Sequence, residues 1–250
     1  MNRDPATIRV LESTNLEKLR MITRGTFTPR LPVMAATILL AFASASAAPA
    51  QSFGPTLTHP SSTALKLPPD GFLQRWLILE PIHVNGLTDS AVQAAVRTEY
   101  FPNQLTVIPR DGDSVTLGNT NLTWHAVETT NYNVNLFHFA RALHKPTSDV
   151  LFWTVTIVTS PEEMHGVRLA VGSNAASVWW VNGQEVIGIY GDRQTVIDDG
   201  VSKRLTLKKG SNVVRCAVIN GGGATDFCGR FLDPDDKPLT TLSVSVEEPR

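Results

Sequence analysis

Short apolar runs, cut by Gly, Asn, Asp and Pro, recur from Phe72 to the end of the chain. The runs are rich in Val, Thr and aromatic residues, which strands prefer. Regular short strands with turn residues between them are typical of a β-sandwich or barrel. The sequence therefore predicts an all-β domain over 71–250, with strands at 75–79, 114–117, 122–127, 151–159, 167–171, 177–181, 185–189, 202–207, 212–218, 227–232 and 242–246.

One short helix is predicted over 90–100, where Val92 and Val96 recur at helical spacing and Thr88 or Asp89 can cap the first turn. Residues 51–70 contain four prolines and many Ser and Thr, without periodicity. This composition predicts a leader ahead of the domain.

The strongest local signal is Asn182-Gly183 between two strand-like runs, because a type I′ hairpin turn needs positive φ at both central residues. The turn places Trp179 opposite Val186 and Trp180 opposite Glu185. Both faces of this hairpin are apolar, so we expect it inside a sheet and not at an edge.

The two cysteines, Cys216 and Cys228, flank a run of three glycines. If the glycines form the bend of a hairpin, the cysteines face each other on antiparallel strands. An oxidising compartment would then join them in a disulfide. The alternative is a pair of buried thiols.

The first 50 residues differ from the rest of the chain. Arg24 and Arg30 precede an apolar run over 31–42, and small residues follow up to Ala50. This order indicates a secretory signal peptide, since about 20 apolar residues are needed to span a bilayer. We expect a secreted or periplasmic protein that begins at Gln51. The alternatives are cleavage after Ala45 or Ala47 and translation from Met21.

The whole chain has 22 basic and 23 acidic residues and a net charge of −1, with no basic stripe. No nucleic-acid partner is therefore expected, and no membrane partner after signal cleavage.

The order of motifs from Phe72 onward resembles the galactose-binding-like jelly-roll domains found beside bacterial glycoside hydrolases and carbohydrate esterases. The matching pieces are Trp76-Leu77-Ile78-Leu79-Glu80-Pro81, Trp124, Trp153-Thr154-Val155-Thr156, Leu169-Ala170-Val171-Gly172-Ser173-Asn174, Val178-Trp179-Trp180-Val181-Asn182-Gly183, Leu205-Thr206-Leu207-Lys208-Lys209-Gly210-Ser211-Asn212 and Arg230-Phe231-Leu232-Asp233.

This resemblance implies a two-sheet antiparallel jelly-roll sandwich, and in many members a structural calcium ion; no other cofactor is expected. Some members bind glycans, and others only pack against a catalytic domain. The chain departs from the family after Gly172-Ser173, where Asn174, Ala175 and Ala176 stand in place of acidic residues. The departure argues against a binding role for that loop.

A search for catalytic residues finds no constellation. Gly112-Asp113-Ser114 resembles the nucleophile block of the Gly-Asp-Ser esterases, but a strand follows it and no histidine occurs after His165. No Gly-x-Ser-x-Gly or His-Glu-x-x-His motif is present, and the histidines lack metal-ligand spacing. We therefore expect no enzyme activity.

Sugar binding needs an exposed aromatic face with polar groups beside it. Trp76, Trp153 and Trp179 lie in apolar runs and are predicted to be core. For Trp124 and Trp180, the sequence is consistent both with packing in the core and with stacking on a sugar ring. The predicted ligand-binding residues are Trp180, Trp124, Asn182, Gln184, Asp192 and Arg193.

The sequence thus favours an exported, non-catalytic carbohydrate-associated module whose partner is a polysaccharide or a glycan-processing enzyme. A structural adaptor that docks on a partner protein is the first alternative, and a glycan esterase or other hydrolase is the second.

Overall fold

In the computed structural model, residues 52–84, 89–174 and 176–248 are described, and they form two antiparallel sheets and two helices. The predicted signal peptide lies outside these residues. The larger sheet has the order β1-β6-β3-β8-β14-β10-β11, with further strands at its borders. Its strands are β1 (Leu57–Thr58), β2 (Leu65–Lys66), β3 (Arg75–Leu79), β4 (Ile82–His83), β5 (Ser114–Leu117), β6 (Thr120–Thr129), β8 (Val150–Ser160), β10 (Ser177–Val181), β11 (Gln184–Ile189), β14 (Gly210–Asn220) and β16 (Ser243–Ser245).

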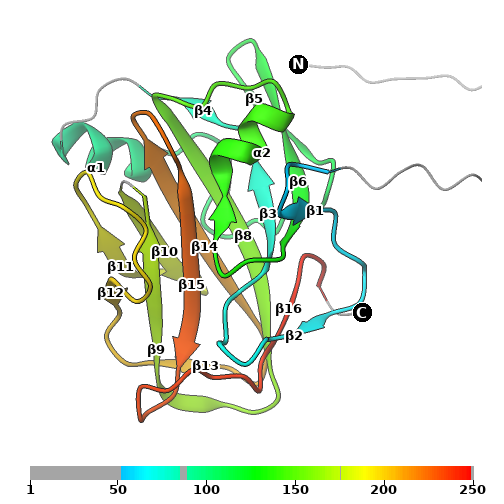
Figure 1. Ribbon diagram of the computed structural model, residues 1–250, viewed down its shortest axis with the longest axis vertical. Helices are drawn as coiled ribbons and strands as arrows, with labels where there is room; N and C mark the ends of the chain where they lie inside the picture. Colours follow the sequence, from blue (N-terminus) through cyan, green and yellow to red (C-terminus); the bar gives the residue numbers. More distant parts are fainter. Residues whose placement is uncertain (1–51, 85–88, 175, 249–250) are drawn as a thin grey trace, which may run out of the picture. The chain divides into compact units, whose positions relative to one another are not determined.

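The smaller sheet has the order β12-β9-β15-β7, and β13 pairs with β9. Figure 1 draws β15 in front of the long strand β14. These arrangements confirm the all-β sandwich. The strands of the smaller sheet are β7 (Val134–Asn135), β9 (Met164–Ser173), β12 (Gly200–Val201), β13 (Leu205–Leu207) and β15 (Asp226–Leu232).

Aromatic side chains from both sheets meet in the interior of the sandwich. The ring of Phe227 on β15 lies edge-on to Trp76 on β3 and Trp179 on β10, with centroids 5.0 and 5.7 Å apart. All three side chains are fully buried. Their packing confirms that Trp76 and Trp179 belong to the core.

A second apolar layer covers the opposite face of the larger sheet. Helix α1 (Asp89–Arg97) contributes Val92 and Val96 to it, and Trp153 and Trp180 contribute from the sheet. Successive strand residues alternate between faces, so all residues of β3 are buried because both of its faces are covered. Helix α1 therefore confirms the predicted helix, which ends three residues earlier than expected.

The sequence did not predict helix α2 (Leu136–Ala142). Asn135 caps it, because its side-chain oxygen accepts a hydrogen bond of 2.7 Å from the backbone N–H of His138. Leu136, Phe139 and Ala140 are buried against the interior. With seven residues the helix is too short to show a clear period in the sequence.

The hairpin at Asn182-Gly183 forms as predicted, with φ of 52° and 80° at the two turn residues. Trp180 lies opposite Glu185 as expected, but a bulge shifts Trp179 opposite Ile187 instead of Val186. Only β10 is internal to the sheet, since β11 ends the strand order.

The predicted disulfide is wrong: both cysteines are free and buried. Cys216 lies on β14 in the larger sheet, and Cys228 lies on β15 in the smaller one, so the glycines join two sheets and do not form a hairpin. Cys216 points into the interior. Gly229 faces Trp179 in the interior, so its neighbour Cys228 points to the opposite face.

Residues 52–70, expected as a leader, pack onto the sandwich. Strand β1 pairs with β6, and β2 pairs with β16. Phe53, Leu57 and Leu67 are buried in the interior cluster. This segment is part of the domain despite its prolines, because isolated apolar side chains anchor it.

Candidate functional site

The structure buries both tryptophans that were predicted to contact a ligand. Trp124 is 2% exposed and Trp180 is 4% exposed. The rings of Trp180 and Trp153 stack with centroids 5.3 Å apart, inside the apolar layer beneath α1. The expectation that these strands leave an indole face open to solvent is therefore wrong.

The polar residues of the predicted site lie in two separate places. Asn182 and Gln184 line a pocket at the tip of the β10–β11 hairpin. Asp192 is exposed in the loop after β11, where Arg193 pairs with Asp199. The structure does not bring the six predicted residues together.

Trp124 nevertheless lies at the floor of a groove of about 640 Å³. One wall is the chain after α1, and the other is the polar turn leading into the border strand β5. The lining residues are Phe101, Pro102, Val107, Pro109, Asp113, Ser114, Val115, Thr116 and Trp124.

Two buried polar side chains hold the first wall in place. Gln104 accepts a hydrogen bond from the N–H of Tyr100 and donates one to the carbonyl of Thr98, over 2.9 and 3.0 Å. Arg215 on β14 donates from Nε to the carbonyl oxygen of Leu105 over 2.8 Å. Burial lowers the pKa of Arg215 to about 10, so the guanidinium stays charged at neutral pH.

The second wall is tied to the groove floor through the backbone. The N–H of Trp124 donates to the carbonyl of Asp113, and the N–H of Gly112 donates to the carbonyl of Trp124, each over 2.8 Å. The Asp113 carboxylate accepts from the N–H of Arg110 over 2.7 Å. Ser114 and Thr116 are exposed beyond it. The groove thus sets hydroxyls and a carboxylate opposite aromatic and proline rings.

Reasoning from the sequence missed Phe101 and the 102–109 wall as site residues, because no strand pattern or motif marks them. The sequence singled out Asp113 and Ser114, but it predicted a polar turn that leads into a strand and not a binding site. Ser114 does open β5 and no helix, contrary to the geometry of a nucleophile elbow.

The adjacent acids Asp198 and Asp199 are both engaged in ion pairs. Asp198 pairs with Arg230, and Asp199 pairs with Arg193. A group of polar contacts that the sequence did not predict joins the buried Glu80 to Lys145 over 2.9 Å and to His125 over 3.4 Å. These pairs satisfy the charges of a packed domain.

The two thiols are poor nucleophiles. Burial raises the pKa of Cys216 well above its ordinary value and raises the pKa of Cys228 to about 12. Both groups therefore stay protonated at neutral pH, whereas the thiolate is the reactive form.

Across residues 52–84, 89–174 and 176–248, no three His, Cys, Asp or Glu side chains converge where a metal ion could bind. The adjacent carboxylates Asp198 and Asp199 are already paired with arginines. No helix in the described part of the chain is long and apolar enough to cross a membrane.

No model of a known protein family matches the sequence, and no curated protein does. Among solved structures, the chain is similar to the PA14 sugar-binding domain from an RTX adhesin, at 15% identity over 67% of this chain and 94% of that chain, with a TM-score of 0.39. The PA14 domain of the MpAFP antifreeze protein is 12% identical over 76% of this chain and 96% of that one, with a TM-score of 0.40.

A β-glucosidase from Kluyveromyces marxianus is 18% identical over 52% of this chain but only 16% of its own length, with a TM-score of 0.32. With TM-scores this low, none of these similarities decides the function.

Proposed function

We propose that the domain is an exported, non-catalytic carbohydrate-binding module that holds a sugar in the groove above Trp124. The observation that carries the proposal is the mixed lining of this groove, in which Phe101 and Pro102 face Ser114 and Thr116.

A sugar ring presents apolar C–H groups on its faces and hydroxyls around its edge. The exposed ring of Pro102 and the half-buried Val107 and Val115 offer contact to the C–H groups, while Asp113 and Ser114 offer hydrogen bonds to the hydroxyls. A volume of about 640 Å³ lies within the roughly 300–1,000 Å³ of known small-ligand sites. The groove therefore has the size and the chemistry for one or two sugar rings.

Fluorine NMR on protein labelled with 5-fluorotryptophan tests the site directly, because the chain has five tryptophans in different environments. Titration with soluble plant oligosaccharides should shift the resonance of Trp124, assigned through Trp124→Phe. The resonance of Trp179, fully buried between the sheets, is the internal control and should not move.

A blocking variant tests the groove independently. Ser114→Arg places a long side chain at the mouth of the groove and should abolish the shift and the retardation in a polysaccharide gel. Ser211→Arg, at another exposed strand serine, is the matched control. Both variants should melt close to wild type, since exposed substitutions usually change stability by less than about 0.5 kcal/mol.

The alternatives give different results. If no glycan shifts Trp124 or retards the wild type, the domain is a structural adaptor that docks on a partner such as a glycan-processing enzyme. Hydrolysis of an aryl ester or glycoside by the purified protein, lost in Ser114→Ala, would establish the hydrolase reading.

Export is a separate part of the proposal. N-terminal sequencing of protein recovered from periplasm or medium should start near Gln51. Intact Met1 or Met21 in those fractions would contradict the signal peptide.

A further inference from the structure

A second pocket, of about 560 Å³, lies between the tip of the β10–β11 hairpin and residues 203–208. Its apolar lining comes from Val181, Val186 and Leu205, and its polar lining is basic and amide-rich. The polar lining residues are Asn182, Gln184, Glu185, Lys203, Arg204, Thr206 and Lys208.

Asn212 holds the two sides of this pocket together. Its buried side-chain oxygen accepts from Nδ2 of Asn182 and from the backbone N–H of Lys208, each over 2.9 Å. Its amide donates back to the carbonyl of Lys208 over 2.8 Å. In turn, the side-chain oxygen of Asn182 accepts from the N–H of Val213 over 3.0 Å. The pocket is therefore preorganised before any ligand arrives.

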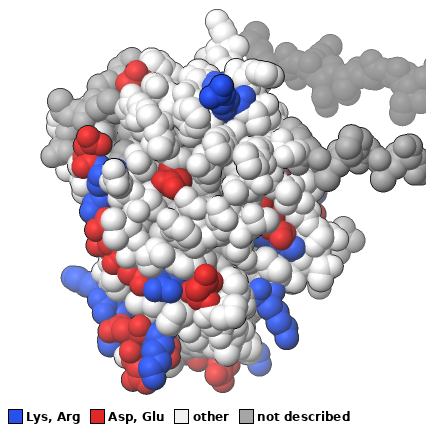
Figure 2. Space-filling model, in the orientation of Figure 1, with Lys and Arg blue, Asp and Glu red and all other residues white. Residues whose placement is uncertain are grey.

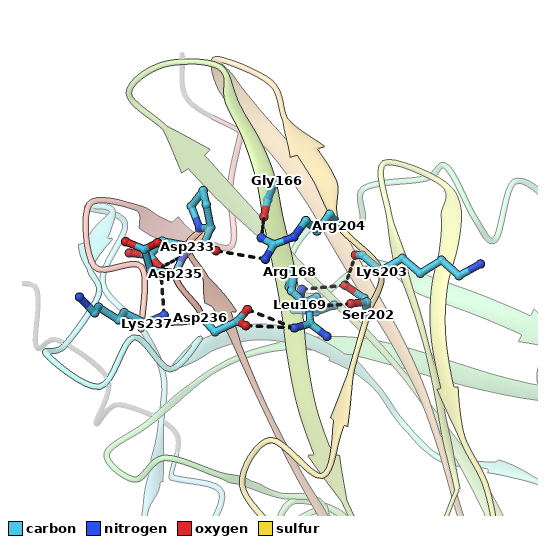
Figure 3. A network of polar contacts seen from close by, with 11 residues as sticks. Gly166, Arg168, Leu169, Ser202, Lys203, Arg204, Asp233, Asp235, Asp236 and Lys237 are labelled. Carbon is cyan, nitrogen blue, oxygen red and sulfur yellow. Dashed lines mark hydrogen bonds and ion pairs between the residues drawn. The ribbon is translucent and has the colours of Figure 1, made fainter.

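The positive charges of the pocket differ in what they already bind. Arg204 donates to the carbonyls of Gly166 and Pro234, over 2.7 and 3.1 Å. Figure 3 shows Arg204 turned into this network, while the side chain of Lys203 extends away from it.

Lys203 and Lys208 are exposed, and neither has an ion pair with any acid that the structure describes. The one acid that lines the pocket, Glu185, lies 3.5 Å from Arg97.

The surroundings make this end of the domain distinct. Figure 2 shows Lys, Arg, Asp and Glu gathered at the lower left of one face, where Figure 1 draws β12 and β13, and fewer charged side chains over the rest of that face. Both signs of charge occur at this end, and the pocket itself is lined by two lysines and an arginine. The groove above Trp124, in contrast, has no basic side chain in its lining.

We infer that this pocket binds acidic oligosaccharides, whose sugar rings carry carboxylates or sulfates. The ammonium groups of Lys203 and Lys208 bind the anion, Gln184 and Thr206 bind hydroxyls, and Val186 and Leu205 contact the ring C–H groups. The class of ligand rests on the proposed carbohydrate function, but the site does not depend on the groove.

Affinity electrophoresis with sodium polygalacturonate, and with dextran sulfate as a second acidic polymer, tests the inference. The fully methyl-esterified form of polygalacturonate is the uncharged match, and poly-L-glutamate is an acidic polymer without sugar. Wild type should be retarded by the acidic polysaccharides, less by the ester, and not by poly-L-glutamate. Retardation should weaken with added salt, because exposed charges are screened.

The double variant Lys203→Gln/Lys208→Gln should bind polygalacturonate roughly three- to tenfold more weakly, as expected for two exposed ion pairs. The matched control, Lys66→Gln/Lys237→Gln, removes the same charge from exposed lysines outside the pocket and should bind like wild type. Circular dichroism and melting should show both variants folded.

Equal loss in both double variants, or equal retardation by poly-L-glutamate, would overturn the inference in favour of unspecific charge attraction. Failure of wild type to bind either acidic polysaccharide would also overturn it. The groove proposal is tested apart from this result, since Ser114→Arg should leave retardation by polygalacturonate unchanged while it removes binding of neutral glycans.

Discussion

Replacing Gly172 by alanine tests how the loop after β11 is seated on the smaller sheet. A Cβ atom at Gly172 would lie 2.0 Å from the carbonyl oxygen of Val196 and 3.2 Å from Sγ of Cys228. Contacts below 3.0 Å do not occur for real Cβ atoms, so the backbone at Val196 must move by more than 1 Å. The loop is anchored on either side of that point, by Thr195 on Asp226 and by Asp198 on Arg230.

We expect Gly172→Ala to lower the free energy of unfolding by about 1–3 kcal/mol, the usual cost of overpacking. For a domain of this size, each kcal/mol corresponds to roughly 2–4 °C in melting temperature. The displaced loop should also expose Cys228, so native Gly172→Ala should react with a thiol reagent faster than wild type.

Gly222→Ala is the matched control, because its Cβ would lie 3.7 Å from the nearest atom, Oγ of Ser148. This variant should keep the wild-type stability or gain about 0.4–1 kcal/mol through lower entropy of the unfolded chain. Equal melting temperatures and equal thiol reactivity for Gly172→Ala and wild type would refute the close approach of Val196 to the sheet.

Three further predictions follow from the packing. Thiol titration of the unfolded, unreduced protein should find two thiols per chain, from Cys216 and Cys228. Finding none would show that a disulfide joins the two cysteines. Trp180→Ala should cost about 3–5 kcal/mol in urea unfolding, since a buried ring is removed, and near-wild-type stability would show that the ring is exposed. Gly183→Val places a β-branched residue at a φ of 80° and should cost about 1–3 kcal/mol; an unchanged urea midpoint would contradict the turn.

Local patterns predicted the strands of this protein well. Strands β3, β5 and β10 have the predicted boundaries, and the other eight predicted strands are present with shifted ends. The unpredicted strands β1, β2, β4, β7 and β12 have two residues each, too few to show any alternation. Turn chemistry was equally informative at Asn182-Gly183, because positive φ is a property of the turn residues themselves.

The candidate groove was only partly predictable. Trp124 and the turn at Asp113-Ser114 drew notice in the sequence, but the opposite wall comes from a segment without regular structure. Its position depends on Gln104, which bonds within the segment, and on Arg215 of β14, which is distant in the sequence. No local sequence pattern predicts the hydrogen bond between Arg215 and Leu105.

The sequence by itself determined where the chain becomes strand, because propensity and turn residues act over a few neighbouring positions. Only the tertiary structure decided which faces are covered and which strands are neighbours. A run such as 177–181 has the same pattern whether its second face packs beneath α1 or binds a ligand, so Trp180 could not be placed. A glycine-rich connection likewise permits a hairpin or a crossing between sheets, and pairing with β8 and β9 separated Cys216 from Cys228. Both choices depend on residues distant in the sequence, which is why local chemistry could not make them.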